Sequence, residues 1–334
     1  MVTQMLIYRY RKFVCVLFTG LLLVWPVLAS SQTAATQEVS VPPMAEEEKI
    51  DQVSQAAPEL PERPFSLAVT YYLLSDYVYR GVNFSEYSGE GREKLNHQMA
   101  TSIDIPLGKK GNLGNFGFDT FFEWFAQQDK LETTPPGHNL QEIDYTLRYS
   151  YDVEPIKTKA TVGWTDFTFP RILSSHDRTN EWFIRLEHND AWMWRGLGYK
   201  GEDGILNPSF CFTQDTGYIL GQWYEVCVKH PVTLCKNVTW TPQCVFAFDG
   251  GYIQPSLNEG KGSGKFEYAY TQPGMELKYD LTELLHLPPQ AGSVYISGQL
   301  YYNAVSAVEK NRNEASHQVL KDLLFGGLAV GWSW

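Results

Sequence analysis

One short segment carries the residue types that nucleophilic catalysis uses. Ser174 and Ser175 are followed directly by His176 and Asp177, the types of a nucleophile, a general base and its orienting acid. Neighbours in a loop seldom face one another in triad geometry, and the sequence contains no HExxH, GxSxG or phosphate-binding glycine loop. We therefore expect no enzyme, no catalytic residue and no cofactor.

Cysteine is the next residue type to consider, because it can form disulfide bonds or bind zinc. The sequence has five cysteines, of which Cys15 lies in the N-terminal segment that we expect to be removed. The other four, Cys211, Cys227, Cys235 and Cys244, contain no CxxC pair. An even number of cysteines in an exported chain indicates disulfide bonds, and four cysteines allow three arrangements. A zinc site is the alternative, which the spacing and an oxidising compartment both disfavour. We expect no metal.

Export is indicated by the first 29 residues, which have the layout of a secretory signal. Arg9, Arg11 and Lys12 precede an apolar run at 13–28, and the small residue Ala29 closes a cleavage site. We expect residues 1–29 to be removed, with an uncleaved anchor helix as the alternative.

Charge and hydropathy exclude two classes of protein. The chain has 27 Lys and Arg against 38 Asp and Glu, a formal net charge of -11, so nucleic acid is a poor partner. Mean hydropathy is -0.29, and one apolar stretch alone approaches the roughly 20 residues of a helical span. A polytopic helical membrane protein is therefore excluded.

Residues 30–64 are rich in Ala, Gln, Glu, Ser and Pro and contain no aromatic residue. Such a segment cannot bury enough apolar surface to offset the entropy of ordering it. We expect a flexible tail in the periplasm.

From Phe65 onward the sequence alternates between apolar and polar residues. In 141–153, for example, Ile143, Tyr145 and Leu147 are separated by polar side chains. This period of two predicts strands with one apolar face. It predicts about twelve of them, at 65–73, 95–107, 116–127, 141–153, 156–169, 181–188, 206–213, 218–229, 243–252, 266–279, 294–302 and 323–334.

Three features favour an all-β, antiparallel transmembrane β-barrel of meander topology over a soluble sheet protein. The predicted strands reach about 10 to 14 residues, near the length of a tilted membrane strand. Aromatic residues gather near strand ends, as in interfacial girdles, Tyr77 and Tyr79 among them. The last strand ends on Trp332 and Trp334, an aromatic end that resembles the assembly signal of outer-membrane barrels. We assign the barrel to residues 65–334.

The segment Leu74–Gly81 resembles the signature of the TorF-like outer-membrane porin family. The signature reads Ser-Asp-Tyr-x-aromatic-Arg-Gly, and here it falls on Ser75, Asp76, Tyr77, Arg80 and Gly81. The resemblance covers eight residues closely and the remainder of 65–334 only in pattern. It implies a barrel and a transport role, with the solute left open.

The alternation, continued through this segment, places Asp76 and Arg80 inward and Tyr77 and Tyr79 outward. The two charges would then either pair within the barrel mouth or fold the first loop inward, and Gly81 permits the turn. A structural bend without solute contact is the alternative.

Charged residues on the polar faces are predicted to line the lumen, where they either brace a plugged interior or ring a wet channel. They are Asp104, Asp119, Glu123, Glu142, Asp144, Arg148, Arg185 and Glu187. On the same assignment Cys211 and Cys227 flank a turn near Ile219 and face the lumen, which suggests the bridges Cys211–Cys227 and Cys235–Cys244.

The sequence thus predicts a bacterial outer-membrane channel for passive diffusion of small solutes. Its partners would be outer-membrane lipid, the barrel assembly machinery and those solutes. A lipid-modifying barrel enzyme using the Ser174–His176 region is one alternative. A soluble, secreted, carbohydrate-binding β-sandwich, with glycosylation acceptors at Asn83 and Asn237, is the other.

Overall fold

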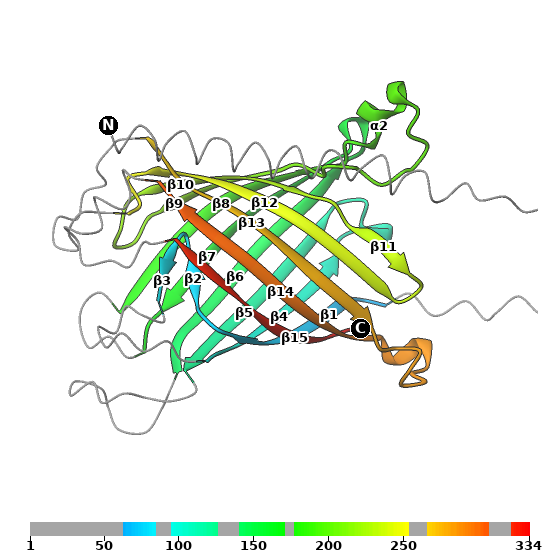
Figure 1. Ribbon diagram of the computed structural model, residues 1–334, viewed down its shortest axis with the longest axis horizontal. Coiled ribbons are helices and arrows are strands. Elements are labelled where there is room, and N and C mark those ends of the chain that lie inside the picture. Colours follow the sequence, from blue (N-terminus) through cyan, green and yellow to red (C-terminus); the bar gives the residue numbers. More distant parts are fainter. Residues whose placement is uncertain (1–62, 85–94, 126–139, 171–176, 254–265, 307–321) are drawn as a thin grey trace, which may run out of the picture. The chain divides into compact units, whose positions relative to one another are not determined.

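The computed structural model describes residues 63–84, 95–125, 140–170, 177–253, 266–306 and 322–334 (Figure 1). The predicted signal at 1–29, nearly all of the predicted tail at 30–64, and the residues Ser174, Ser175 and His176 lie outside these ranges. The long strands are β1 (Ser66–Leu74), β4 (Asn96–Pro106), β5 (Asn115–Phe125), β6 (Leu140–Val153), β7 (Thr158–Thr168), β8 (Arg178–His188), β9 (Ser209–Asp215), β10 (Gln222–Lys229), β11 (Val232–Cys235), β12 (Val238–Gly250), β13 (Glu267–Asp280), β14 (Ser293–Val305) and β15 (Leu323–Ser333).

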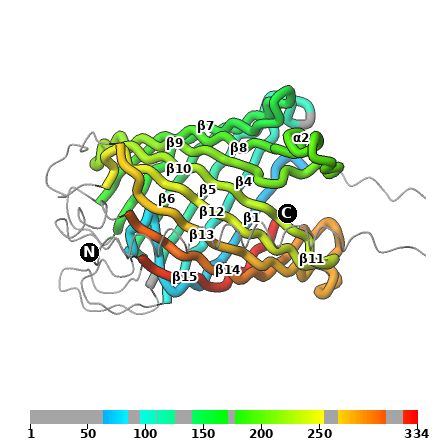
Figure 2. The backbone as a smooth tube through the Cα atoms, turned by 45° about the horizontal axis from the view of Figure 1, so that its top comes forward, coloured from blue at the N-terminus to red at the C-terminus, as the bar shows by residue number. Residues whose placement is uncertain are grey.

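These strands form one antiparallel sheet that closes on itself. Neighbours in the sheet are neighbours in the chain, and β10 and β11 share one place because both pair with β12. The first and last strands complete the ring, from Ala68 opposite Ser333 to Leu74 opposite Gly327. The result is the predicted meander barrel of twelve strands, tilted as Figures 1 and 2 show. A two-sheet sandwich is wrong, because the sheet is single and closed.

Alternation places apolar side chains outside the barrel and polar ones inside. Leu147, Trp164 and Trp182 are cross-strand neighbours on β6, β7 and β8 and all are exposed. Arg148, one residue on, points to the other face, where 15% of its side chain is accessible. An apolar exterior around a polar interior is what a barrel presents to a bilayer.

One strand begins earlier than its sequence predicts. The alternation predicts a start at residue 243. A proline within a strand lacks the N–H for one ladder hydrogen bond. In the structure β12 begins at Val238. Pro242 is tolerated because its missing N–H faces the break between β10 and β11, where His230 N donates to Pro242 O at 3.0 Å.

Another strand begins later than predicted. Residues 218–221 were expected to open a strand, but β10 starts at Gln222. The Asp215 Oδ1 atom accepts hydrogen bonds from the backbone N–H groups of Gly217, Ile219 and Leu220 at 2.9 to 3.0 Å. One side chain therefore holds these residues as a turn, near Ile219 as expected.

The barrel has two ends, named here by their connections. At the loop end β1 finishes and residues 75–95 lead to β4; at the turn end lie the 3₁₀ turn Glu154–Ile156 and Trp334. Two connections at the turn end are longer and locally structured. Residues 189–208 contain α2 (Ala191–Trp194), and residues 281–292 contain a 3₁₀ helix at Pro289–Ala291. Within the described ranges, no helix has the length and apolar character to cross a bilayer.

The aromatic C-terminus is tied to the turn end. Trp332 Nε1 donates to Ala291 O at 2.8 Å and Trp334 Nε1 to Gln290 O at 2.9 Å. Arg63 lies over the Trp334 ring at 4.7 Å. The structure thus gives both tryptophans a local role, and their recognition by the assembly machinery stays a prediction.

Candidate functional site

The chain leaves β1 and folds back as a short hairpin at the loop end. β2 (Val78–Tyr79) and β3 (Val82–Asn83) pair antiparallel. The two residues between them, Arg80 and Gly81, have φ of 50° and 81°, as two-residue hairpin turns with positive φ at both central positions require. Glycine adopts this conformation freely, whereas Arg80 must be held there by its contacts. Residues 75–84 are called the lumen hairpin below.

The lumen hairpin lies inside the barrel. It contacts four strands of the wall: Tyr77 packs on Phe121 of β5, Tyr79 on Phe167 of β7, Arg80 on Glu181 of β8, and Gly81 O accepts from Asn303 of β14. Because these strands belong to different parts of a closed wall, only a segment in the interior reaches all of them. Figure 1 shows β2 and β3 at the loop end.

Arg80 sits at the centre of a buried cluster. Its Nη1 and Nη2 atoms donate to the two oxygens of Glu181 at 2.5 and 2.7 Å, and the two side chains are 7% and 3% exposed. The guanidinium carbon lies 4.1 Å from the ring centre of Tyr252, 4.7 Å from that of Tyr79 and 5.8 Å from that of Trp223. A bidentate carboxylate and aromatic faces together are the strongest surroundings a protein offers to this group.

Carboxylates dominate the charge around the lumen hairpin. Within the described ranges Arg80 is the one buried cation, and seven buried carboxylates share the loop end with it, namely Asp76, Glu123, Glu142, Asp166, Glu181, Asp215 and Asp249. No three acidic, histidine or cysteine side chains of the described residues gather as a metal site would need. Acidic side chains therefore outnumber basic ones in the described part of the interior at this end.

The placement of the signature residues agrees with the sequence in part. Asp76 and Arg80 point inward as expected, and the first loop does fold into the barrel. They do not pair with each other: Asp76 accepts from Asn83 Nδ2 at 2.8 Å, and Arg80 binds Glu181. The outward, girdle positions predicted for Tyr77 and Tyr79 are wrong, because the strand alternation ends with β1 and the hairpin carries both rings into the interior.

The eight charged residues predicted for the lumen lie on the face opposite the exposed apolar side chains, in three groups. Arg148 forms ion pairs at 2.7 Å with Asp104 and Asp119. Glu123 accepts a hydrogen bond from Asn96 and lies opposite Glu142 in the ladder, with Asp144 one inward position further along β6. On β8, Arg185 lies over the ring of Phe183, and Glu187 is 4.0 Å from Lys229.

Sequence reasoning missed the partners of Arg80. Glu181 alternates in step with Arg185 and Glu187 on β8, so the same pattern that found those two residues could have found it. Trp223 alternates in step with Cys227, which the sequence assigned to the lumen, so the pattern could have found it as well. Tyr252 carried no such signal, because it lies beyond the end of β12 at Gly250, where the alternation stops.

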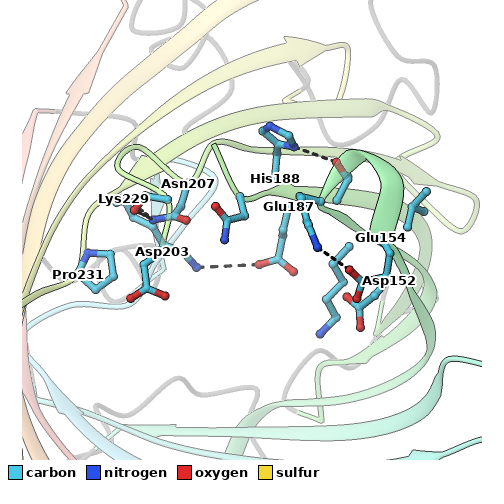
Figure 3. A pocket seen from close by; sticks show the side chains of 14 residues that line it. Asp152, Glu154, Glu187, His188, Asp203, Asn207, Lys229 and Pro231 are labelled. Carbon is cyan, nitrogen blue, oxygen red and sulfur yellow. Dashed lines mark hydrogen bonds and ion pairs between the residues drawn. The ribbon is translucent and has the colours of Figure 1, made fainter. Parts of the chain in front are cut away.

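The other half of the lumen contains cavities. A cavity of about 530 Å³ opens at the turn end between Lys229, Glu187 and the turn of Glu154 and Lys157 (Figure 3). A hydrogen bond from Lys157 Nζ at 2.8 Å, together with its charge, lowers the pKa of Glu154. Two more cavities, of about 540 and 320 Å³, adjoin at Ala68 and Ser102 and reach Asp144. Space thus extends inward from the turn end, and the lumen hairpin occupies the loop end.

The predicted disulfides are wrong for this structure, in which the four described cysteines are free thiols. Cys211 lies opposite Glu225 and Cys227 opposite Ser209, so these two are diagonal neighbours about 7 to 8 Å apart, beyond a disulfide's usual span. Cys235 pairs with Val238, whereas Cys244 lies opposite Val228, roughly 20 Å further along β12.

Comparison with known proteins adds solved barrels at low similarity. No protein-family model matches the chain, and no curated protein matches it. The NanC porin is 10% identical, with 80% of this chain and 98% of that one covered and a TM-score of 0.40. An outer membrane channel from Pseudomonas putida F1 is 8% identical, covering 84% and 100%, with a TM-score of 0.42.

Outer membrane phospholipase A from Escherichia coli is 12% identical, covering 80% and 95%, with a TM-score of 0.40. Channels and an enzyme therefore match equally well. At these values the likeness carries no argument about function, which has to come from the chain's own residues.

Proposed function

We propose that this protein is a channel of the bacterial outer membrane that passes small solutes and favours cations. The observation that carries the proposal is the closed barrel whose interior holds cavities from the turn end inward and is occupied at the loop end by the lumen hairpin. The turn end, with the N-terminal tail, would face the periplasm, and the loop end the outside.

The membrane location is supported by the exterior of the barrel. Its exposed side chains are large and apolar on one strand after another, for example Leu147, Val162, Ile184, Leu300 and Val330. A soluble protein with so much contiguous apolar surface would aggregate, whereas a bilayer covers it. The resemblance to the TorF-like family agrees with this proposal and stays a prediction.

The preference for cations is supported by the interior. Among the described residues, seven buried acidic side chains at the loop end are accompanied by the buried Arg80 and by the exposed Arg178, which pairs with Asp166 at 2.7 Å. Asp104 and Asp119 share one arginine nearer the turn end. A narrow path past the lumen hairpin, lined by this excess of acidic side chains, would lower the barrier for cations and raise it for anions.

The test is electrical. Refolded protein, shown to be folded because its gel mobility changes on boiling, is added to a planar bilayer with a potassium chloride gradient. We expect discrete conductance steps and a reversal potential on the side of potassium. A variant with residues 77–84 replaced by a Gly-Ser linker should give larger steps. Absence of steps from both folded proteins would refute the channel, and an anion-selective reversal potential would refute the preference.

A lipid-modifying enzyme stays an untested alternative, because its candidate residues Ser174, Ser175 and His176 lie outside the described residues.

A further inference from the structure

We infer that the surroundings of Arg80 form a guanidinium-binding site and that a free solute bearing a guanidinium group competes with Arg80 for it, which releases the lumen hairpin. The site consists of Tyr79, Glu181, Trp223 and Tyr252 and is called the cage below. The release of the hairpin rests on the proposed channel function; the binding of the group does not.

The chemistry of the cage is selective. The planar guanidinium presents two parallel N–H groups to both oxygens of Glu181, at 2.5 and 2.7 Å, while the Tyr252 ring centre lies 4.1 Å from its carbon. An ammonium ion is a compact point charge that cannot make the parallel pair of bonds. A neutral urea of the same shape lacks the charge that the buried carboxylate requires.

Most of the cage stands without Arg80. The Tyr252 hydroxyl donates to Glu181 Oε1 at 2.5 Å, and the Tyr252 backbone N–H donates to Asp249 at 2.5 Å. Trp223 is 1% exposed, and its Nε1 donates to Glu225 at 2.8 Å. Tyr79 alone belongs to the hairpin. Loss of the Arg80 side chain would therefore leave a carboxylate and two aromatic faces in position.

Arg80, by contrast, reaches the cage from a small element, the lumen hairpin. The hairpin has two residues in each strand, and a two-stranded hairpin is marginal by itself. Gly81 adds one bond from Asn303 at 3.3 Å. Tyr77 and Tyr79 pack on the wall, and Val82 lies in the buried cluster around Trp223. A solute that satisfies Glu181 in place of Arg80 removes the one buried ion pair that joins the hairpin to β8, and the acidic interior concentrates such a cation near it.

The binding experiment compares Arg80→Ala with a matched control, Arg185→Ala. The control also removes an inward-facing arginine side chain, but Arg185 lies on β8 and is not part of the cage. Both are refolded in detergent and titrated with methylguanidinium by calorimetry. We expect Arg80→Ala to bind it at least tenfold more tightly than wild type or Arg185→Ala. Methylurea should not bind, methylammonium should bind more weakly, and Glu181→Gln added to Arg80→Ala should abolish binding. Equal binding by Arg80→Ala and Arg185→Ala would overturn the site.

The competition is tested on wild-type protein. Methylguanidinium at millimolar concentration should raise its conductance and speed hydrogen exchange in residues 77–84, and methylurea should do neither. Unchanged exchange overturns the competition, and this arm also serves if Arg80→Ala does not fold. If no variant conducts but binding and exchange behave as expected, the cage stands and the proposed channel function fails.

Discussion

Removal of one charge from the Arg80–Glu181 pair should loosen the lumen hairpin far more than the barrel. Glu181→Gln keeps the size of the side chain and leaves Arg80 buried beside a neutral amide. Because the two side chains are 7% and 3% exposed, solvent screens the pair little. Removing one partner of such a pair costs about 3 to 5 kcal/mol. The hairpin can escape that cost by moving Arg80 into water, so the strands need not separate.

The expected magnitude follows from the conversion of about 1.4 kcal/mol per factor of ten. The population with the hairpin released should rise by roughly two to three and a half orders of magnitude. The assay is hydrogen exchange followed by mass spectrometry on peptides covering 77–84, where Phe84 N donates to Tyr77 O at 2.8 Å in the docked hairpin. Exchange there should accelerate at least a hundredfold (~3 kcal/mol), while exchange in β6 stays as in wild type.

Two further variants control the reasoning. The double variant Arg80→Met with Glu181→Leu removes both charges and should recover most of the protection, because no charge is left buried alone. Lys157→Met breaks the exposed pair with Glu154 and should leave exchange unchanged. Wild-type exchange in Glu181→Gln, or a double variant as loose as the single one, would refute the view that the buried pair holds the hairpin.

Three other predictions test the exterior, the cysteines and the turn end. Leu147 lies on the exposed face midway along β6. Leu147→Arg should lower the unfolding free energy by about 2 to 4 kcal/mol in a reversible urea titration in vesicles, and Ile156→Arg at the turn by about 0 to 1 kcal/mol. Equal losses would show that the depth of these residues in the bilayer is misassigned. Cys211, Cys227, Cys235 and Cys244 should all be alkylated in denatured, unreduced protein, and a cross-linked peptide would contradict this. Burial raises the pKa of Asp190, but hydrogen bonds from Trp194, Asn207 and Leu206 outweigh burial and lower this pKa. The stability that ionised Asp190 contributes is therefore complete above the ordinary carboxyl pKa of about 3.9. It is lost as the pH falls through the lower pKa of the folded protein. Proteolysis of 189–208 should therefore begin only below about pH 4 in wild type and at neutral pH in Asp190→Ala.

The two halves of the interior surround their arginines differently. The lumen hairpin fills the loop half, and cavities lie in the turn half. Arg148 has 15% of its side chain exposed and pairs with Asp104 and Asp119, which line two of the cavities. Arg80 has only 7% of its side chain exposed. An arginine beside water can exchange partners at low cost, whereas a buried one keeps a single partner until its element moves.

The sequence by itself determined the class of fold and the faces of the strands. Alternation is a local property: a strand puts successive side chains on opposite sides whatever its neighbours are. Residues such as Leu147 and Arg148 could therefore be assigned to opposite faces from the chain alone, and closure followed from a last strand, ending in Trp332 and Trp334, that needed a partner. Alternation does not fix the end of a strand where one side chain, as with Asp215, or one break in a neighbouring strand, as beside Pro242, decides it.

Only the tertiary structure decided what Arg80 binds. Glu181 is 101 residues away in the chain, and Tyr252 is a further 71 residues on. Whether these groups meet depends on the register of every strand pair between them and on how far the hairpin enters the barrel. Alternation in the sequence cannot predict how far the hairpin enters the barrel, because the alternation that assigns side chains to faces ends where β1 ends. The same reason explains the error at Tyr77 and Tyr79: beyond the last residue of the ladder, packing inside the closed wall decides direction.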